Sequence, residues 1–271
     1  MASGRWITRL AERIGLGLLA LGVTTAAGAG EGAPCAKPLY LTFDTGHMGV
    51  APLIADVLAR QHVLVTFFAA NERTRAGDGS LGAQWAGWWH ARAAEGHEFA
   101  SHTFDHVYWR GDVAGDPPRF RVRPSAGADA GRDLVWSAAQ YCAEIEHSGR
   151  RLQEMTGKQP LPLFRAPGGK TSPKLLAAAQ GCGYRHVGWS PAGFLGDELP
   201  DSVSNEQLLA RALRDIRPGD ILLAHLGIWS RREAWAPAVL EPLLVGLKDK
   251  GFCFRTLRDH PAYRGWIAKA R

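Results

Sequence analysis

Two histidines and an aspartate stand where short apolar runs of the chain end. His102 and His106 are four residues apart in the segment SHTFDH, and Asp44 closes an upstream run that ends in Thr-Phe-Asp. Imidazoles at this His-x3-His spacing can bind one metal ion from one side, and a neighbouring carboxylate can take a proton from a water activated there. We therefore predict a hydrolytic metal site in which the two histidines lie one helical turn apart.

Seven short runs rich in β-branched and aromatic residues could position such a site, because helix-like stretches separate them. Alternating strands and helices favour a parallel sheet covered by helices, and seven units favour a barrel over an open sheet. The predicted strands span 39–43, 63–69, 98–101, 161–164, 184–188, 220–224 and 252–257, and the predicted helices span 50–60, 84–95, 136–155, 173–180, 205–215 and 237–250.

Five polar or aromatic residues fall at or just after the carboxyl end of a predicted strand: Asp44, His102, Arg165, Trp189 and His225. Barrels of parallel strands gather their catalytic residues at that end. The sequence therefore predicts one site at the carboxyl-terminal rim of the barrel.

The first 29 residues differ from the rest of the chain. Three arginines precede an apolar run at 14–23, and small residues then lead to Ala29. This order is typical of a secretory signal peptide, and the run is too short to span a bilayer. We expect cleavage near Ala29, a mature domain at 30–271 without a stable membrane span, and a periplasmic or secreted protein. The alternative is an uncleaved amphipathic anchor.

Export makes the four cysteines interpretable, since thiols outside the cytosol tend to pair. Cys35 precedes the first predicted strand and Cys253 lies in the last, whereas Cys142 and Cys182 fall on or beside successive helices. Of the three pairings that four cysteines allow, we favour Cys35 with Cys253 and Cys142 with Cys182. No two cysteines have the C-x2-C spacing of a zinc site.

The composition is typical of a folded protein, because 46% of the 271 residues are hydrophobic and 21% are charged. The formal net charge of +6 falls to +4 after cleavage, because the leader carries three arginines and one glutamate. This charge is compatible with an acidic glycan, but the chain has no dense Lys/Arg stripe, so we predict no nucleic-acid partner.

Five ordered motifs carry a resemblance to a known family: TFDTG at 42–46, SHTFDH at 101–106, RAPGG at 165–169, GWS at 188–190 and LAH at 223–225. Over 38–257 the chain resembles the polysaccharide deacetylases of carbohydrate esterase family 4, the NodB-homology domain. The resemblance implies an α/β fold, a distorted (β/α)7 barrel of parallel strands. It also implies removal of acetyl groups from N-acetylated sugars with a divalent metal, zinc above all, with cobalt or nickel as alternatives.

The same resemblance implies roles for individual residues. Asp44 is similar to the general base, Arg165 to the arginine that orients it, and His225 to the acid that protonates the leaving amine. An acid is needed because an amide anion is a very poor leaving group. The remaining positions are His102 and His106 as metal ligands, Leu223 and Trp189 as the acetyl pocket, and Pro167 and Gly168 as substrate-binding residues.

Two departures from the family pattern affect this site. Thr45 stands where the family carries a second Asp as third metal ligand, and a hydroxyl is a much weaker ligand than a carboxylate. The metal could keep two histidines and extra waters, which we favour; His47 or another group could substitute; or metal binding could be lost. The residue that tunes His225 is also open, because Asp197 could serve but its register is uncertain.

A third departure is the connection 107–134, rich in Pro, Gly, Arg and Asp. We expect a long loop without regular structure at the active rim, forming a lid or a substrate-binding wall, with a floppy surface insertion as the alternative. The segment 71–82 could form a shorter rim loop. The side chains of the longer connection available to sugar rings or acidic groups are Tyr108, Trp109, Arg119, Arg121 and Arg123.

These observations predict a single-domain hydrolase that removes N-acetyl groups from a polysaccharide or peptidoglycan-type glycan. A non-catalytic glycan-binding barrel is the competing hypothesis, motivated by Thr45. A third interpretation keeps hydrolysis but changes the bond, to an O-acetyl ester or a small amide.

Overall fold

The computed structural model describes residues 35–270, so the expected signal peptide lies outside the described residues. Seven parallel strands form the main sheet, which confirms the predicted α/β barrel of parallel strands. All seven predicted strands exist, although three of them are only two residues long. They are β1 (Pro38–Asp44), β2 (Thr66–Ala69), β3 (Glu98–Ser101), β7 (Leu163–Phe164), β8 (Arg185–His186), β9 (Ile221–His225) and β10 (Cys253–Phe254).

The barrel is distorted because its closure is irregular. The strands pair in the order β8-β7-β3-β2-β1-β9, and β10 pairs with the first residues of β1. The segment between β8 and β9 contains no regular strand, but two of its backbone amides donate hydrogen bonds to carbonyls of β9. The Ser190 amide donates to the carbonyl of Ile221 over 3.0 Å, and the Leu195 amide donates to that of Leu223 over 3.1 Å.

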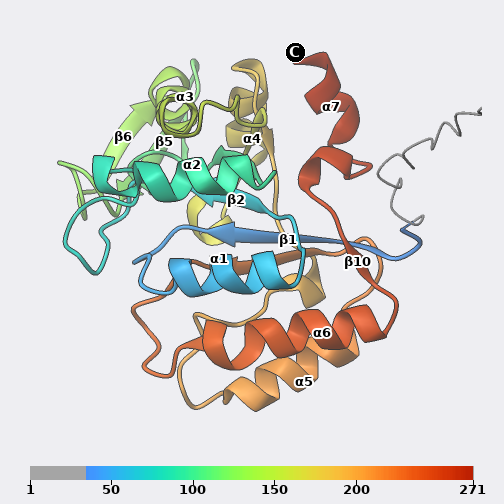
Figure 1. Cartoon of the computed structure of the whole chain (residues 1–271). Coiled ribbons are helices and arrows are strands. Elements are labelled where there is room, and N and C mark those ends of the chain that lie inside the picture. Colours follow the sequence, from blue (N-terminus) through green and yellow to red (C-terminus); the bar gives the residue numbers. More distant parts are fainter. Residues whose placement is uncertain (1–34, 271) are drawn as a thin grey trace, which may run out of the picture. The chain divides into compact units, whose positions relative to one another are not determined.

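Helices cover this sheet (Figure 1), with α1 just below β1 and with α6 and α5 further below it in that view. Serine side chains cap α3, α4 and α5 by accepting a hydrogen bond from the first turn, which explains why these helices begin where they do. The helices are α1 (Ala51–Arg60), α2 (Ala86–Ala94), α3 (Ala138–Thr156), α4 (Pro173–Gly181), α5 (Asn205–Asp215), α6 (Glu241–Asp249) and α7 (Arg264–Lys269).

Side chains of β1 alternate between two environments, as a strand requires. Leu41 and Phe43 belong to a core cluster that includes buried residues of α1 and α6. Tyr40 belongs to a second cluster with Phe68 and Ile221 in the barrel interior. Asp44 is four residues after Tyr40, so the same alternation turns its carboxylate inward at the strand end.

The prediction that 107–134 is a long loop without regular structure was wrong. This connection forms a three-stranded antiparallel sheet made of β4 (Val107–Val113), β5 (Arg119–Pro124) and β6 (Leu134–Ser137). In β5, Phe120 and Val122 are buried against α3, whereas the three arginines that alternate with the buried residues are exposed. The Pro and Gly content masked this period-two alternation, which is the signature of a strand with one buried face.

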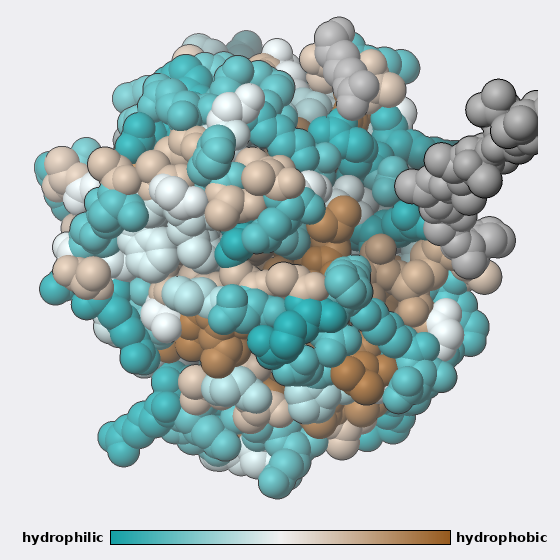
Figure 2. All heavy atoms as spheres, viewed as in Figure 1, coloured by the Kyte–Doolittle hydropathy of each residue, from teal (hydrophilic) through white to brown (hydrophobic). Residues whose placement is uncertain are grey.

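Both favoured disulfides are present, Cys35 with Cys253 and Cys142 with Cys182. The first ties the start of the barrel to β10, and the second ties α3 to the residue that follows α4. Among the described residues, no helix has the length and apolar character needed to cross a membrane. The face in Figure 2 is mainly hydrophilic, with small separate apolar patches.

Candidate active site

Asp44 and Arg165 form a buried ion pair at the carboxyl end of β1. The Arg165 Nη1 lies 2.6 Å from Asp44 Oδ1 and 2.9 Å from the Thr42 hydroxyl, and its other nitrogens donate to the carbonyls of Val187 and Gly188. Arg165 is 0% exposed. Burial alone would raise the pKa of Asp44, but Arg165, with help from nearby histidines, outweighs it and holds the pKa below the ordinary value of an aspartate. Asp44 is therefore a fixed, ionised carboxylate.

The His102–His106 segment is a turn and not the helical turn that we predicted. Thr103 and His106 adopt left-handed backbone conformations, with φ of 59° and 49°, which no helix tolerates. The turn still brings the two rings together, with centroids 4.8 Å apart. The pair is thus positioned by an irregular, strained loop after β3, a type of position that is common at functional sites.

Hydrogen bonds fix the same tautomer in both histidines. The His102 Nδ1 lies 2.9 Å from the carbonyl of Arg165, which can only accept. The His106 Nδ1 lies 2.6 Å from the Ser125 hydroxyl, which itself donates to the His106 carbonyl. Both Nδ1 atoms therefore carry the proton, and both Nε2 atoms keep a free lone pair. Burial lowers the pKa of His102 to about 4, so its imidazole is neutral.

This donor set fits a divalent metal. The bare His102 Nε2 lies 3.4 Å from Asp44 Oδ2, so a lone pair and a carboxylate face each other without a proton between them. A cation relieves that repulsion, and imidazoles oriented through their other nitrogen are typical zinc ligands. In residues 35–270, however, no three His, Cys, Asp or Glu side chains are already arranged to hold an ion.

Thr45 occupies the position expected of the third ligand, but its hydroxyl is already engaged. It donates to Glu72 Oε2 over 2.7 Å and accepts from the Ala70 amide over 3.0 Å. The other oxygen of Glu72 lies 3.9 Å from His106 Nδ1. Glu72 was not among the predicted site residues, although its segment was predicted as a rim loop and a carboxylate was known to be lacking at residue 45.

His47 contributes to a turn in the same region. Its Nδ1 accepts the Gly49 amide over 2.9 Å, and its ring lies edge-on to Trp229, with centroids 4.9 Å apart. The backbone of Gly227 packs directly against the ring. The structure therefore gives His47 a local structural contact and does not bring its Nδ1 to the histidine pair as a free ligand.

His225 ends β9 beside Asp44, since these two residues are register partners across β9 and β1. Asp197 accepts the His225 amide over 2.6 Å, and both of its oxygens lie 3.1 Å from His225 Nδ1. Burial would lower the pKa of His225, but Asp197 outweighs it and raises the pKa to about 9. The structure thus brings Asp197 to the position of the tuning partner, in a loop whose register the sequence left open.

The predicted substrate residues line one side of the same rim. Leu223 is buried in β9, and Trp189 is half-buried, with its ring centroid 5.8 Å from the Arg165 guanidinium carbon. Pro167 and Gly168 lie in η2 (Pro167–Gly169). Gly168 has a φ of 66°, and a Cβ there would come within 3.0 Å of the Tyr108 ring, so glycine is needed for this close approach.

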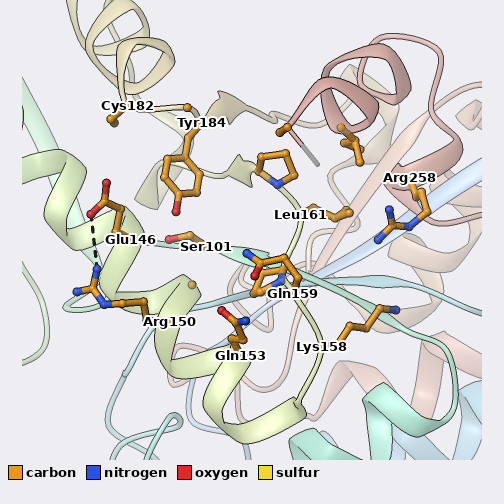
Figure 3. Close-up of a pocket in the computed structure, with 16 residues that line it drawn as sticks. Ser101, Glu146, Arg150, Gln153, Lys158, Gln159, Leu161, Cys182, Tyr184 and Arg258 are labelled. Carbon is orange, nitrogen blue, oxygen red and sulfur yellow. Dashed lines mark ion pairs between the residues drawn. The ribbon is translucent and has the colours of Figure 1, made fainter.

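A cavity of about 680 Å³ lies elsewhere, between α3 and the segment that precedes β7 (Figure 3). Its lining includes Glu146 and Arg150 of α3, together with Lys158, Tyr184 and Arg258. None of the predicted catalytic or metal-binding residues lines it. Because converging charged and titratable groups are the better indicator of chemistry, the rim and not this cavity is the candidate active site.

Curated relatives support the assignment of family. The chain is 27% identical over 231 residues to a chitooligosaccharide deacetylase of Azorhizobium caulinodans, covering 81% of this chain and 92% of that protein. It is 25% identical over 229 residues to a peptidoglycan-N-acetylglucosamine deacetylase of Bacillus cereus, covering 84% and 90%.

Solved structures support the fold. A family 4 acetyl xylan esterase from Clostridium thermocellum, in complex with cobalt, superposes with a TM-score of 0.62 at 23% identity, covering 84% of this chain and 92% of that one. A family 4 pseudoenzyme from Bacillus anthracis superposes with a TM-score of 0.60 at 17% identity, covering 83% and 65%. The fold therefore occurs with and without activity.

The family model for polysaccharide deacetylases matches residues 31–187, which is more than half of the chain and includes three of the five motifs in full. The match agrees with the barrel of parallel strands and with the residues gathered at its rim. The chain belongs to the polysaccharide deacetylase family.

Proposed function

We propose that this protein is a metal-dependent hydrolase that removes N-acetyl groups from a glycan. The observation that carries the proposal is the presence of two separate acid–base pairs at one rim, Asp44 with Arg165 and His225 with Asp197. Amide hydrolysis needs a base that is deprotonated and an acid that is protonated at the same pH. The low pKa of Asp44 and the high pKa of His225 meet that requirement.

The histidine pair is proposed to hold the metal. The Nε2 atoms of His102 and His106 would be its ligands, with zinc as the first choice and cobalt or nickel as alternatives. A divalent cation, when bound, supplies a Lewis acid that polarises a carbonyl and lowers the pKa of water to about 7. The cobalt complex of the Clostridium esterase is consistent with such a cation in this fold.

Hydrolysis then needs two proton transfers, one to a residue of this chain and one from another. Asp44 takes a proton from the water that attacks the acetyl carbon, while Arg165 keeps the carboxylate ionised and aimed. As the carbon–nitrogen bond breaks, His225 gives its proton to the amine nitrogen. The products are acetate and a free amino sugar, and the proton taken by Asp44 is available to restore His225.

Substrate recognition is proposed to combine an acetyl pocket with a sugar platform. Leu223 and Trp189 offer apolar surface beside the reacting atoms. Trp229, in the loop after His225, is 64% exposed, and its ring packs against the edge of the His47 ring. A flat exposed aromatic ring in the loop that follows the proposed general acid is suited to packing against a pyranose ring.

Export is part of the proposal. The expected leader at 1–29 would direct the chain out of the cytosol, and disulfides such as the two in this chain are usual in proteins of an oxidising compartment.

The curated relatives named for chitooligosaccharide and peptidoglycan support an N-acetylglucosamine polymer as substrate class. The direct test is acetate release from N-acetylglucosamine oligomers by the purified protein; release supports the proposal, and stoichiometric metal without release from any N-acetylated glycan contradicts it.

Asp197 is expected to set the alkaline limit of activity. His225 acts as an acid only while protonated, and a pKa of about 9 keeps it protonated across neutral pH. The groups that raise this pKa are Asp197, Asp44 and Glu198, with Asp197 the largest contributor. In Asp197→Asn the alkaline limb of kcat should therefore move from about pH 9 toward the ordinary histidine value of 6.5.

A pH profile of kcat for acetate release checks this prediction. Asp201→Asn is the matched control, because Asp201 is an exposed carboxylate of the same loop whose partners are the backbone amides of residues 232 and 233 and the Arg231 guanidinium, and not His225. Its limb should coincide with that of the wild type. An unchanged limb in Asp197→Asn would remove Asp197 from the role of tuning partner.

A further inference from the structure

We propose that Glu72 is the third metal ligand of this protein and replaces the carboxylate that Thr45 lacks. The inference rests on the proposed function, which it completes by supplying the anionic ligand of the metal site. Its starting point is a contact between two loops that are distant in sequence: the Thr45 hydroxyl donates to Glu72 Oε2 over 2.7 Å. A carboxylate therefore lies within hydrogen-bond distance of the family's ligand position, but it comes from the loop after β2.

The Thr45 hydroxyl is oriented to hold this carboxylate. Its lone pair accepts the Ala70 amide over 3.0 Å, which leaves its single proton for Glu72. Thr45 is fully buried, so water does not compete for either bond. Thr45 is thus a positioning residue, and a hydroxyl at residue 45 has a specific use when the carboxylate is supplied from elsewhere.

The loop that carries Glu72 is anchored to the histidine turn. The Asn71 amide donates to the carbonyl of Phe104, which lies between His102 and His106 in the sequence, over 2.6 Å. The Ser80 amide donates to the Glu72 carbonyl over 2.8 Å and closes the loop on itself. These backbone bonds fix Glu72 relative to both histidines, as a metal site on a loop requires.

The second oxygen of Glu72 is available to an ion. It lies 3.9 Å from His106 Nδ1, and the Glu72 side chain is only 20% exposed. Ser125 already accepts the proton of that Nδ1, so Glu72 is not needed as its partner. A partly buried carboxylate together with two histidine imidazoles is the His2Glu donor set of many catalytic zinc sites.

The same arrangement leaves Asp44 free. Asp44 is bound by Arg165 and faces His102, so the site contains one carboxylate for the ion and another for proton transfer. Because no three candidate ligands within residues 35–270 are already closed around a point, binding includes a local movement of the Glu72 side chain toward the histidines.

Zinc titration calorimetry on the metal-stripped protein tests the inference without any activity measurement. We expect one zinc per chain for the wild type. Glu72→Gln should weaken zinc binding by at least about 100-fold, which is the upper end of the effect typical of outer-shell partners. The visible spectrum of the cobalt-loaded protein should change as well, because one oxygen donor is lost.

Two further variants separate ligation from charge and from misfolding. Glu198→Gln removes an exposed rim carboxylate that influences His225 and Tyr108, and its zinc affinity should stay close to that of the wild type. The double variant Thr45→Asp with Glu72→Gln moves the carboxylate to the position used by the family. It should recover most of the affinity that Glu72→Gln loses.

Each outcome of these measurements either supports or overturns the assignment of Glu72 as a ligand. Equal zinc affinity in wild type and Glu72→Gln, or no zinc binding by the wild type, overturns the inference. Equal weakening in Glu198→Gln reduces Glu72 to a general charge effect and also overturns it. If zinc binds through Glu72 but no N-acetylated glycan releases acetate, the ligand assignment stands and the proposed function fails.

Discussion

Asp44→Asn should lower kcat for acetate release by about 10²- to 10⁴-fold, the range typical of a general base. The asparagine amide cannot take a proton from water, although its oxygen can still accept the hydrogen bond from Arg165. Initial rates of acetate release from N-acetylglucosamine oligomers measure the effect.

Stability must be measured in parallel, because this change leaves a fully buried guanidinium without its counter-ion. Removing one partner of a buried ion pair typically costs about 3–5 kcal/mol. Circular dichroism at the assay temperature identifies the fraction that remains folded. Asp220→Asn is the matched control, since Asp220 precedes β9 at the opposite end of the barrel and should have no effect on rate. A folded Asp44→Asn protein with wild-type kcat would exclude Asp44 as the base.

His225→Ala should separate amide from ester hydrolysis. An amine cannot leave without a proton, whereas an alkoxide leaves far more readily, so the variant should lose about 10²- to 10⁴-fold in N-acetyl hydrolysis and much less in ester hydrolysis. The measurement compares N-acetylglucosamine oligomers with an acetylated xylan under the same conditions. His90→Ala, an exposed histidine of α2, is the control and should leave both rates unchanged.

The ratio of the two losses also tests the alternative hydrolase. If wild-type protein cleaves the ester faster than the amide and His225→Ala leaves that preference intact, the protein is an O-acetyl esterase on the same barrel. Equal losses on both substrates would contradict the role of His225 as leaving-group acid and would favour a structural role beside Asp197.

Much of the fold could be predicted because its strands carry strong local patterns. The apolar runs before Asp44 and His225 are long, and both strands were found to within a residue or two of their observed bounds. The strands β7, β8 and β10 are shorter than predicted, because their partners pair with only two residues of each run. Local sequence identifies a strand, but the neighbouring strand decides how much of it is paired.

The small antiparallel sheet and the histidine turn show a different limit. In β5, three exposed arginines alternate with Phe120, Val122 and Pro124. The composition of this segment, taken without the order of its residues, is that of a polar loop. The His-x3-His spacing was found, but its helical interpretation failed. Left-handed conformations at Thr103 and His106 depend on tertiary contacts that spacing does not encode.

Glu72 and Asp197 were difficult to predict for a shared reason. Each lies in a loop and contacts a partner that is distant in the sequence. Glu72 is 27 residues from Thr45, and Asp197 is 28 residues from His225. Nothing in the local sequence sets the path of such loops. Asp197 entered the prediction only through the expected need of His225 for a partner, and the corresponding question, which carboxylate replaces residue 45, would have directed attention to Glu72.

The non-catalytic barrel remains the main competing function, since a pseudoenzyme shares the fold. A binding protein has no need for a buried Arg165 that holds Asp44 ionised, nor for an Asp197 that keeps His225 protonated. Both pairs carry a cost in desolvation that sugar binding alone does not explain. These pairs are the reason that the catalytic proposal is preferred despite Thr45.

One paired measurement tests the central claim most directly: metal content of the purified protein together with acetate release from N-acetylglucosamine oligomers, before chelation, after chelation, and after return of zinc or cobalt. We expect about one zinc per chain, acetate release that chelation abolishes, and recovery on metal return. A metal-free protein that releases no acetate even with zinc present would contradict the account and favour the binding barrel.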